Sequence, residues 1–331
     1  MGGEVSGGLR SGRVNVGGRG RLLVGCVFAA VTIAGSVLLA RHLTHTTWPL
    51  QRAHMRLVVL AGALYFTSFI FRALGWQKLF PARGRPDRAR CLAACGAAAA
   101  SGAVLPFRLD YLVKIGTLRR LGGVRLTLEA IALSIVALGL VDAVAFLPLS
   151  ISATATSTAT LRPPLIMVVL FGVGACGILV AGPRLSRLPV VRRHALLQRA
   201  AGRMEHSWPS RTPTAIAAGC FLLGCWTSRA LGSAVLLASL GVDFSPTLAL
   251  VVLCLGAAAS LIPITSAGAI ANVSMTASIL LTLGIGKNQA INFGLASGLL
   301  LCGTALLAAL VGLAISTARN LRERMLAAAS V

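Results

Sequence analysis

Acidic residues are scarce in this sequence, and charged residues of either sign are few. Only 8 of the 331 residues are Asp or Glu, and charged residues make up 12% of the chain. In a typical soluble domain about a quarter of the residues are charged. Several apolar runs are long enough to cross a bilayer core of about 30 Å, which takes about 20 helical residues. We therefore expect an all-α integral membrane protein.

The sequence also lacks the motifs of common soluble enzymes. It contains no nucleotide-binding loop, zinc-protease motif or serine nucleophile elbow. A glycine pattern at residues 172–177 matches the dinucleotide consensus, but it lies inside an apolar run, so close helix packing explains it better. The eight cysteines lie in apolar segments, where they act as small hydrophobes. We expect no enzymatic activity, no cofactor and no metal site.

Basic residues, in contrast, are abundant: 31 Lys and Arg give a net charge of +23. In a soluble protein this excess would indicate nucleic-acid binding. Here aromatic residues are only 5% of the chain, which leaves few side chains for base stacking. The basic residues lie between apolar runs, where they typically face the cytoplasm and contact anionic headgroups. We expect membrane lipids as partners, anionic or linked to polyprenyl phosphate, and no nucleic acid.

The apolar runs fall into two length classes. Six are long enough for full spans: residues 22–40, 57–75, 127–149, 165–181, 214–240 and 289–316. Four shorter segments form two pairs: 91–105 with 107–122, and 247–262 with 267–285. Pro106 separates the first pair and Pro263 the second, and proline breaks a helix because it lacks the amide donor. We predict about six full transmembrane helices and two Pro-broken re-entrant hairpins.

The distribution of Lys and Arg sets the predicted topology. If the N-terminus is cytoplasmic and both hairpins are re-entrant, most of the 31 basic residues lie in the cytoplasm, as the positive-inside rule requires. Both termini are then cytoplasmic. We divide the chain into a disordered basic tail (residues 1–20), a membrane domain (21–317) and a cytoplasmic tail (318–331). The Ala-, Arg- and Gly-rich composition and the absence of a targeting peptide suit a bacterial plasma membrane.

An internal repeat relates the two halves of the membrane domain, about residues 21–150 and 165–317. The tetrapeptide Arg-Ala-Leu-Gly at residues 72–75 recurs at residues 229–232, and the same shift of 157 places Pro106 on Pro263. Each half has three full crossings, so the second half must be inverted relative to the first. Inverted repeats with matched broken helices are typical of transporters, whose substrate path lies between the repeats.

Four charged residues lie within the predicted spans; Glu129 is at the start of its helix, where stabilisation of the N-terminus explains it, and the other three are Arg72, Asp142 and Arg229. A charge at bilayer depth costs several kcal/mol unless it is paired or hydrated, which makes it a functional candidate. Arg229 lies near the middle of its span, whereas Arg72 can also reach the cytoplasmic edge. Asp142 lies deep in the fourth span, where it can pair with an intramembrane arginine, take part in proton coupling or form a structural hydrogen bond.

The two helix breaks differ in chemistry. The first carries Arg108 and Lys114, which suit a lipid phosphate or, alternatively, a basic collar at the membrane edge. The second is neutral and rich in hydroxyls, and freed backbone amides there can line a polar path. Our candidate substrate-binding residues come from both breaks and from the spans: Pro106, Arg108, Lys114, Asp142, Arg229, Pro263, Thr265 and Gly268.

These residues resemble the flippase-like family related to the membrane region of lysylphosphatidylglycerol synthases. That family carries a Pro-x-Arg-x-Gly-Glu-x-x-Arg element after a short third helix. Pro106 and Arg108 match it, Lys114 stands at its second basic position, and Asp110 and Tyr111 replace its Gly-Glu pair.

The family then has an Arg and an Asp in the next span. Only the Asp remains here, as Asp142, and Gly139 occupies the Arg position. In the late Pro- and Gly-rich turn, Pro263 and Gly268 remain, while Val273 occupies the carboxylate position. The likeness covers residues 20–317.

The resemblance implies translocation of a phospholipid or lipid-linked glycan across the plasma membrane. The synthases of this group need an additional soluble aminoacyl-transfer domain, which the sequence does not contain, so we do not expect this chain to make the lipid. Two alternatives remain. The chain is a secondary transporter of a small anionic solute, with Asp142 as coupling carboxylate, or it is a non-transporting membrane partner of an envelope glycosyltransferase.

Overall fold

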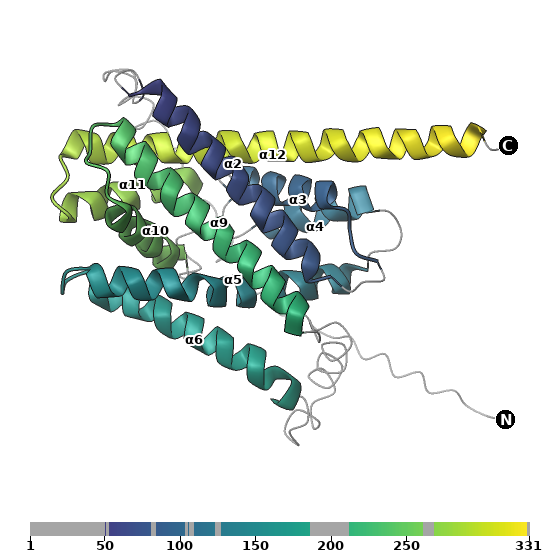
Figure 1. Ribbon diagram of the computed structural model, residues 1–331, viewed down its shortest axis with the longest axis horizontal. Helices are drawn as coiled ribbons and strands as arrows, with labels where there is room; N and C mark the ends of the chain where they lie inside the picture. The colour runs from purple at the N-terminus through teal and green to yellow at the C-terminus, as the bar shows by residue number, and fades with distance from the viewer. Residues whose placement is uncertain are drawn as a thin grey trace, which may run out of the picture. The chain divides into compact units, whose positions relative to one another are not determined.

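The structure, a computed structural model, describes residues 50, 53–80, 84–102, 105, 109–122, 127–185, 212–260 and 268–329. Within these ranges the chain forms nine α-helices and no strand (Figure 1). They are α2 (Met55–Lys78), α3 (Arg88–Gly102), α4 (Asp110–Gly122), α5 (Leu128–Thr156), α6 (Arg162–Leu185), α9 (Thr212–Ser239), α10 (Pro246–Ser260), α11 (Gly268–Thr282) and α12 (Lys287–Ala329). The predicted basic tail, the first span (22–40), Pro106, Arg108, Pro263 and Thr265 lie outside the described residues.

Five of the described helices are long and apolar enough to cross a membrane: α2, α5, α6, α9 and α12. They coincide with five of the six predicted spans, which confirms an all-helical, multi-pass membrane protein. Helices α3, α4, α10 and α11 have only 13 to 15 residues. A 15-residue helix is about 22 Å long, shorter than a bilayer core of about 30 Å. The four short helices lie where the sequence predicts the two broken hairpins.

Two of the long helices, α5 and α12, extend furthest beyond the predicted spans. Helix α5 continues through Pro148 to Thr156, and Thr127 caps its start by accepting a hydrogen bond from the Ala130 amide at 3.3 Å. Helix α12 runs for 43 residues, because no Pro or Gly follows Gly312 and the remaining residues are mostly good helix formers. The predicted cytoplasmic tail thus begins within a continuous helix.

Helices α2 and α9 pack side by side along most of their length and run in opposite directions (Figure 1). Tyr65, near the middle of α2, shares a hydrogen bond of 2.9 Å with Ser233. Nearer the end of α2, a Cβ on Gly75 would lie 3.1 Å from Leu222. As α2 advances from Tyr65 to Gly75, its contact on α9 moves back from Ser233 to Leu222, so the two helices are antiparallel. The glycine allows the helices to approach closely.

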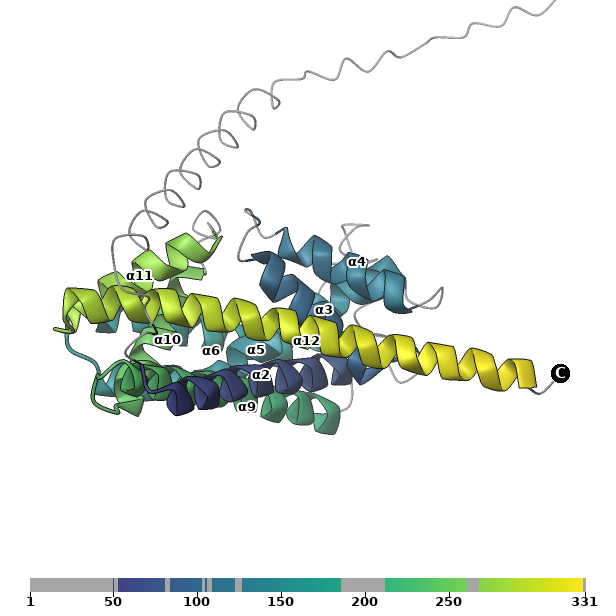
Figure 2. The same ribbon diagram turned by 90° about the horizontal axis from the view of Figure 1, so that it is seen from above.

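Helix α12 lies beside two of the short helices, α11 along its first part and α3 along its middle (Figure 2). The contact with α3 depends on glycine. A Cβ on Gly96 would lie 2.5 Å from the Ala305 carbonyl oxygen, and one on Gly312 would lie 2.5 Å from the Ala93 amide. Real Cβ atoms do not approach backbone this closely, so only glycine permits this spacing.

Two series of four helices share the same order and packing. Helices α9 to α12 begin 157 to 159 residues after their counterparts α2 to α5. Contacts also recur between counterparts: α3 packs on α12 as α10 packs on α5, and α5 packs on α9 as α12 packs on α2. Helix α6 has no counterpart in the described part of the chain. One face of α6 is buried, at Leu165 and Val168, whereas other apolar side chains, including Met167 and Val180, are well exposed, as expected for a lipid-facing helix.

Candidate functional site

Arg72 and Asp142 form an ion pair in the interior of the described helices. The Arg72 guanidinium donates to Oδ2 of Asp142 at 2.9 Å, and Nε1 of Trp226 donates to Oδ1 of the same carboxylate at 2.7 Å. The two side chains are only 24% and 12% exposed. The Arg72 side chain therefore turns toward Asp142 in the interior of the helices. Both oxygens of the carboxylate are occupied, and each charge has an opposite partner.

Lys114 is buried, only 5% exposed. Its Nζ lies 4.1 Å from the centroid of the Trp76 ring, a cation–π contact worth about 0.5–2 kcal/mol. Nε1 of Trp76 in turn donates to Oγ of Ser134 at 3.1 Å. Lys114 is also close enough to Arg72 and Asp142 for electrostatic interaction. From the sequence we expect this amine at a lipid phosphate or in a basic collar at the membrane edge; in the structure it lies inside the helix bundle.

Arg229 has a different environment from Arg72. Its Nε donates to Oγ of Ser68 at 3.2 Å, and its guanidinium lies 5.4 Å from the ring centroids of both Phe69 and Trp226. Among the described residues, no carboxylate forms an ion pair with Arg229. Aromatic faces and one hydroxyl stabilise the cation only partly, so Arg229 retains capacity for an anion.

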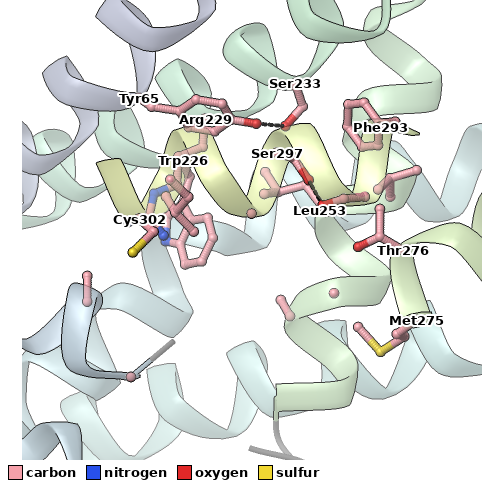
Figure 3. A pocket seen from close by; sticks show the side chains of 18 residues that line it. Tyr65, Trp226, Arg229, Ser233, Leu253, Met275, Thr276, Phe293, Ser297 and Cys302 are labelled. Atoms are coloured by element: carbon pink, nitrogen blue, oxygen red, sulfur yellow. Dashed lines mark hydrogen bonds between the residues drawn. The ribbon is translucent and has the colours of Figure 1, made fainter. Parts of the chain in front are cut away.

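A cavity of about 330 Å³ lies beside Arg229. Figure 3 shows Arg229 and Trp226 at one end of it, with the hydrogen-bonded pair Tyr65 and Ser233 close by. Helices from both series contribute to its walls, which combine apolar side chains with a few hydroxyls such as that of Thr276. Ligand sites of about 300–1,000 Å³ with a few convergent polar groups are typical of small-molecule binding.

The structure brings together only part of the predicted site. Arg229 lines the cavity, and Asp142 is linked to it through Trp226, which contacts both. Gly268 begins α11, and Lys114 does not line the cavity. Trp226 was not among the predicted site residues, although its position three residues before Arg229 places both on one helix face. Tyr65 and Ser233 were not predicted either, because they carry no distinctive sequence signal.

Residues 21–309 match the family model described as the lysylphosphatidylglycerol synthase TM region. The chain belongs to this family. Comparisons with curated proteins and with solved structures gave no match. Membership of the lysylphosphatidylglycerol synthase membrane-region family confirms the resemblance drawn from Pro106, Arg108 and Asp142. It also agrees with a lipid-related role in the membrane.

Proposed function

We propose that this protein moves an anionic lipid, a phospholipid or lipid-linked glycan, between the leaflets of a bacterial plasma membrane. The observation that carries the proposal is Arg229, a cation without a described carboxylate partner at the wall of a cavity between two helix series. A half-buried cation of this kind favours a ligand that brings a negative charge. In this account the chain is not an enzyme, its ends are cytoplasmic, and it works alone or beside an envelope-biosynthesis enzyme.

An inverted repeat is part of the proposal. The antiparallel contact of α2 with α9, the helix offset of 157 to 159 residues and the reciprocal contacts all support it. In inverted-repeat transporters the substrate site lies at the interface between repeats, and rocking of one repeat against the other exposes it alternately to each side. The cavity has this placement, since α2 and α3 from one series and α9 to α12 from the other line it.

Lipid translocation in proteoliposomes tests the proposal directly. Vesicles carrying NBD-labelled phosphatidylglycerol are treated with dithionite, which quenches only the outer leaflet, and lipid that crosses becomes accessible. The wild-type protein is expected to accelerate crossing over protein-free vesicles. Arg229→Gln is expected to slow crossing about tenfold or more, because a hydrogen bond to a charged group is worth about 1.5–3 kcal/mol.

Arg322→Gln provides the matched control, since Arg322 lies exposed on α12 and the same charge is removed. Its translocation rate is expected to equal that of the wild type. If the wild-type protein moves lipid no faster than empty vesicles, the transport proposal fails. Proton-driven uptake of a small anionic solute would then identify a secondary transporter, and absence of both activities would leave the non-transporting membrane partner.

A further inference from the structure

The two helix series differ at corresponding positions around their arginines. The shift of 157 that places Arg72 on Arg229 also places Trp76 on Ser233. Between α5 and α12 the helix starts are offset by 159 residues, and this shift aligns residues 137–140 (Ala-Leu-Gly-Leu) with 296–299 (Ala-Ser-Gly-Leu). The same shift places Asp142 on Leu301, which lines the cavity together with Ser233.

In the first series, side chains of the protein occupy the positions that correspond to the cavity of the second series. Asp142 pairs with Arg72, and the Trp76 ring is covered by Lys114 at 4.1 Å. In the second series the aromatic ring is replaced by the small Ser233, and the carboxylate is replaced by Leu301. The cavity of about 330 Å³ lies there. The second series thus keeps the cation and lacks both the counter-charge and the filling side chains.

We propose that a lipid phosphate binds in this cavity against Arg229, in the place that the Asp142 carboxylate takes against Arg72. The identification of the ligand as a lipid rests on the proposed function, whereas the anion site rests on the geometry. The guanidinium offers paired N–H donors that match phosphate oxygens. The ligand therefore completes in the second series the ion pair that the first series contains.

Neighbouring hydroxyls can contribute to the same site. Tyr65 and Ser233 share one hydrogen bond of 2.9 Å, so one of their two hydroxyl hydrogens is left to donate elsewhere. Both residues line the cavity. Trp226 already donates its only N–H to Asp142, so it contributes a ring face and not a hydrogen bond. The site therefore recognises the phosphate chiefly through Arg229, with one hydroxyl as support.

The substitution Leu301→Asp tests this assignment, because it places a carboxylate where the second series lacks one. The intact chain in detergent is titrated with dihexanoyl phosphatidylglycerol, and binding is measured by calorimetry. Leu301→Asp is expected to weaken binding about tenfold or more by pairing with Arg229, as Asp142 pairs with Arg72. Leu301→Asn has the same size without the charge, and it is expected to bind within about threefold of the wild type.

Equal binding by Leu301→Asp and Leu301→Asn would overturn the assignment. Arg229→Gln provides a second variant that buries no new carboxylate, so the assignment can fail even if Leu301→Asp does not fold. If Arg229→Gln binds the lipid with wild-type affinity, the assignment is contradicted. Inorganic phosphate is titrated in parallel, and binding as tight as that of the lipid would overturn the lipid assignment in favour of free phosphate.

The binding experiment separates the two proposals. If binding depends on Arg229 but the protein moves no lipid in vesicles, the binding site is supported and the transport function is contradicted. Translocation that persists while Leu301→Asp binds as well as Leu301→Asn leaves the function and removes the site.

Discussion

The helix series α2–α5 and α9–α12 place an arginine at the same position and surround it differently. Arg72 meets the carboxylate of Asp142 at 2.9 Å, whereas Arg229 meets two aromatic faces and the Ser68 hydroxyl. A paired charge within a membrane protein stabilises helix packing, and an incompletely neutralised one is available to a ligand. The residue type is the same in both series, so the neighbours distinguish the paired arginine from the one that we propose binds a ligand.

The largest expected effect comes from removing the ion pair of the first series, Arg72 with Asp142. Asp142→Leu leaves Arg72 without its counter-charge and Trp226 without its acceptor, which is expected to destabilise the fold by about 3–5 kcal/mol. Thermal unfolding in detergent measures the change. The double variant Arg72→Leu/Asp142→Leu is expected to recover much of the loss, because it removes both charges. Asp243→Leu, at an exposed position, serves as the control. An unchanged unfolding midpoint for Asp142→Leu would show that the pair is not structural.

A second prediction concerns the contact between α3 and α12. Gly96→Ala places a Cβ 2.5 Å from backbone atoms of Ala305 and Ala309, so the helices must separate, at a cost of about 1–3 kcal/mol. In the second series, the corresponding contact is between α10 and α5. Cys254 stands there at the position of Gly96 and packs in a cluster with Phe146, so this contact does not require glycine. Gly303→Ala is the matched control because its Cβ meets nothing within 4 Å. Equal unfolding midpoints for Gly96→Ala and Gly303→Ala would contradict the close packing.

A third prediction makes the second series resemble the first. Ser233→Trp introduces into the cavity the ring that Trp76 provides in the first series. Translocation is expected to fall about tenfold, which corresponds to about 1.4 kcal/mol in the barrier. Unfolding and translocation are measured on the same preparation. Thr227→Trp, at an exposed position on the same helix, is the control and is expected to move lipid at the wild-type rate. Normal translocation by Ser233→Trp would show that the lipid does not use this cavity.

The smallest expected effect concerns Lys114. Lys114→Met removes the cation–π contact with Trp76 but also removes a buried charge, so the change in stability is expected to stay under about 1 kcal/mol. Translocation is expected to stay close to the wild-type rate, because Lys114 does not line the cavity. A strong loss of translocation would return Lys114 to the phosphate-binding role that its place in the family motif implies.

The sequence predicts the positions of the helices better than the contacts between them. Run length identifies five long helices, and Pro106 and Pro263 mark the two breaks, because span length and helix breaking are local properties. A charge within a span likewise draws attention to Arg229 and Asp142. Which arginine pairs with Asp142 depends on how α2, α5 and α9 pack, and this information lies in contacts far apart in the chain.

Other features of the site depend on the same long-range packing. Long-range packing buries Lys114 against Trp76. It also brings Tyr65 and Ser233 together at the cavity wall. The continuation of α12 past the predicted boundary at residue 317 has a local cause, since helix formers follow without a break. The prediction missed it because only the apolar span was delimited.

The central claim is that Arg229, and not Arg72, receives the negative charge of the transported lipid. The most direct measurement is the ratio of translocation rates for phosphatidylglycerol and phosphatidylcholine in wild-type and Arg229→Gln proteoliposomes. We expect the wild-type protein to prefer the anionic lipid and Arg229→Gln to move both lipids at similar, slow rates. If Arg229→Gln keeps the wild-type ratio and rate, the account is contradicted.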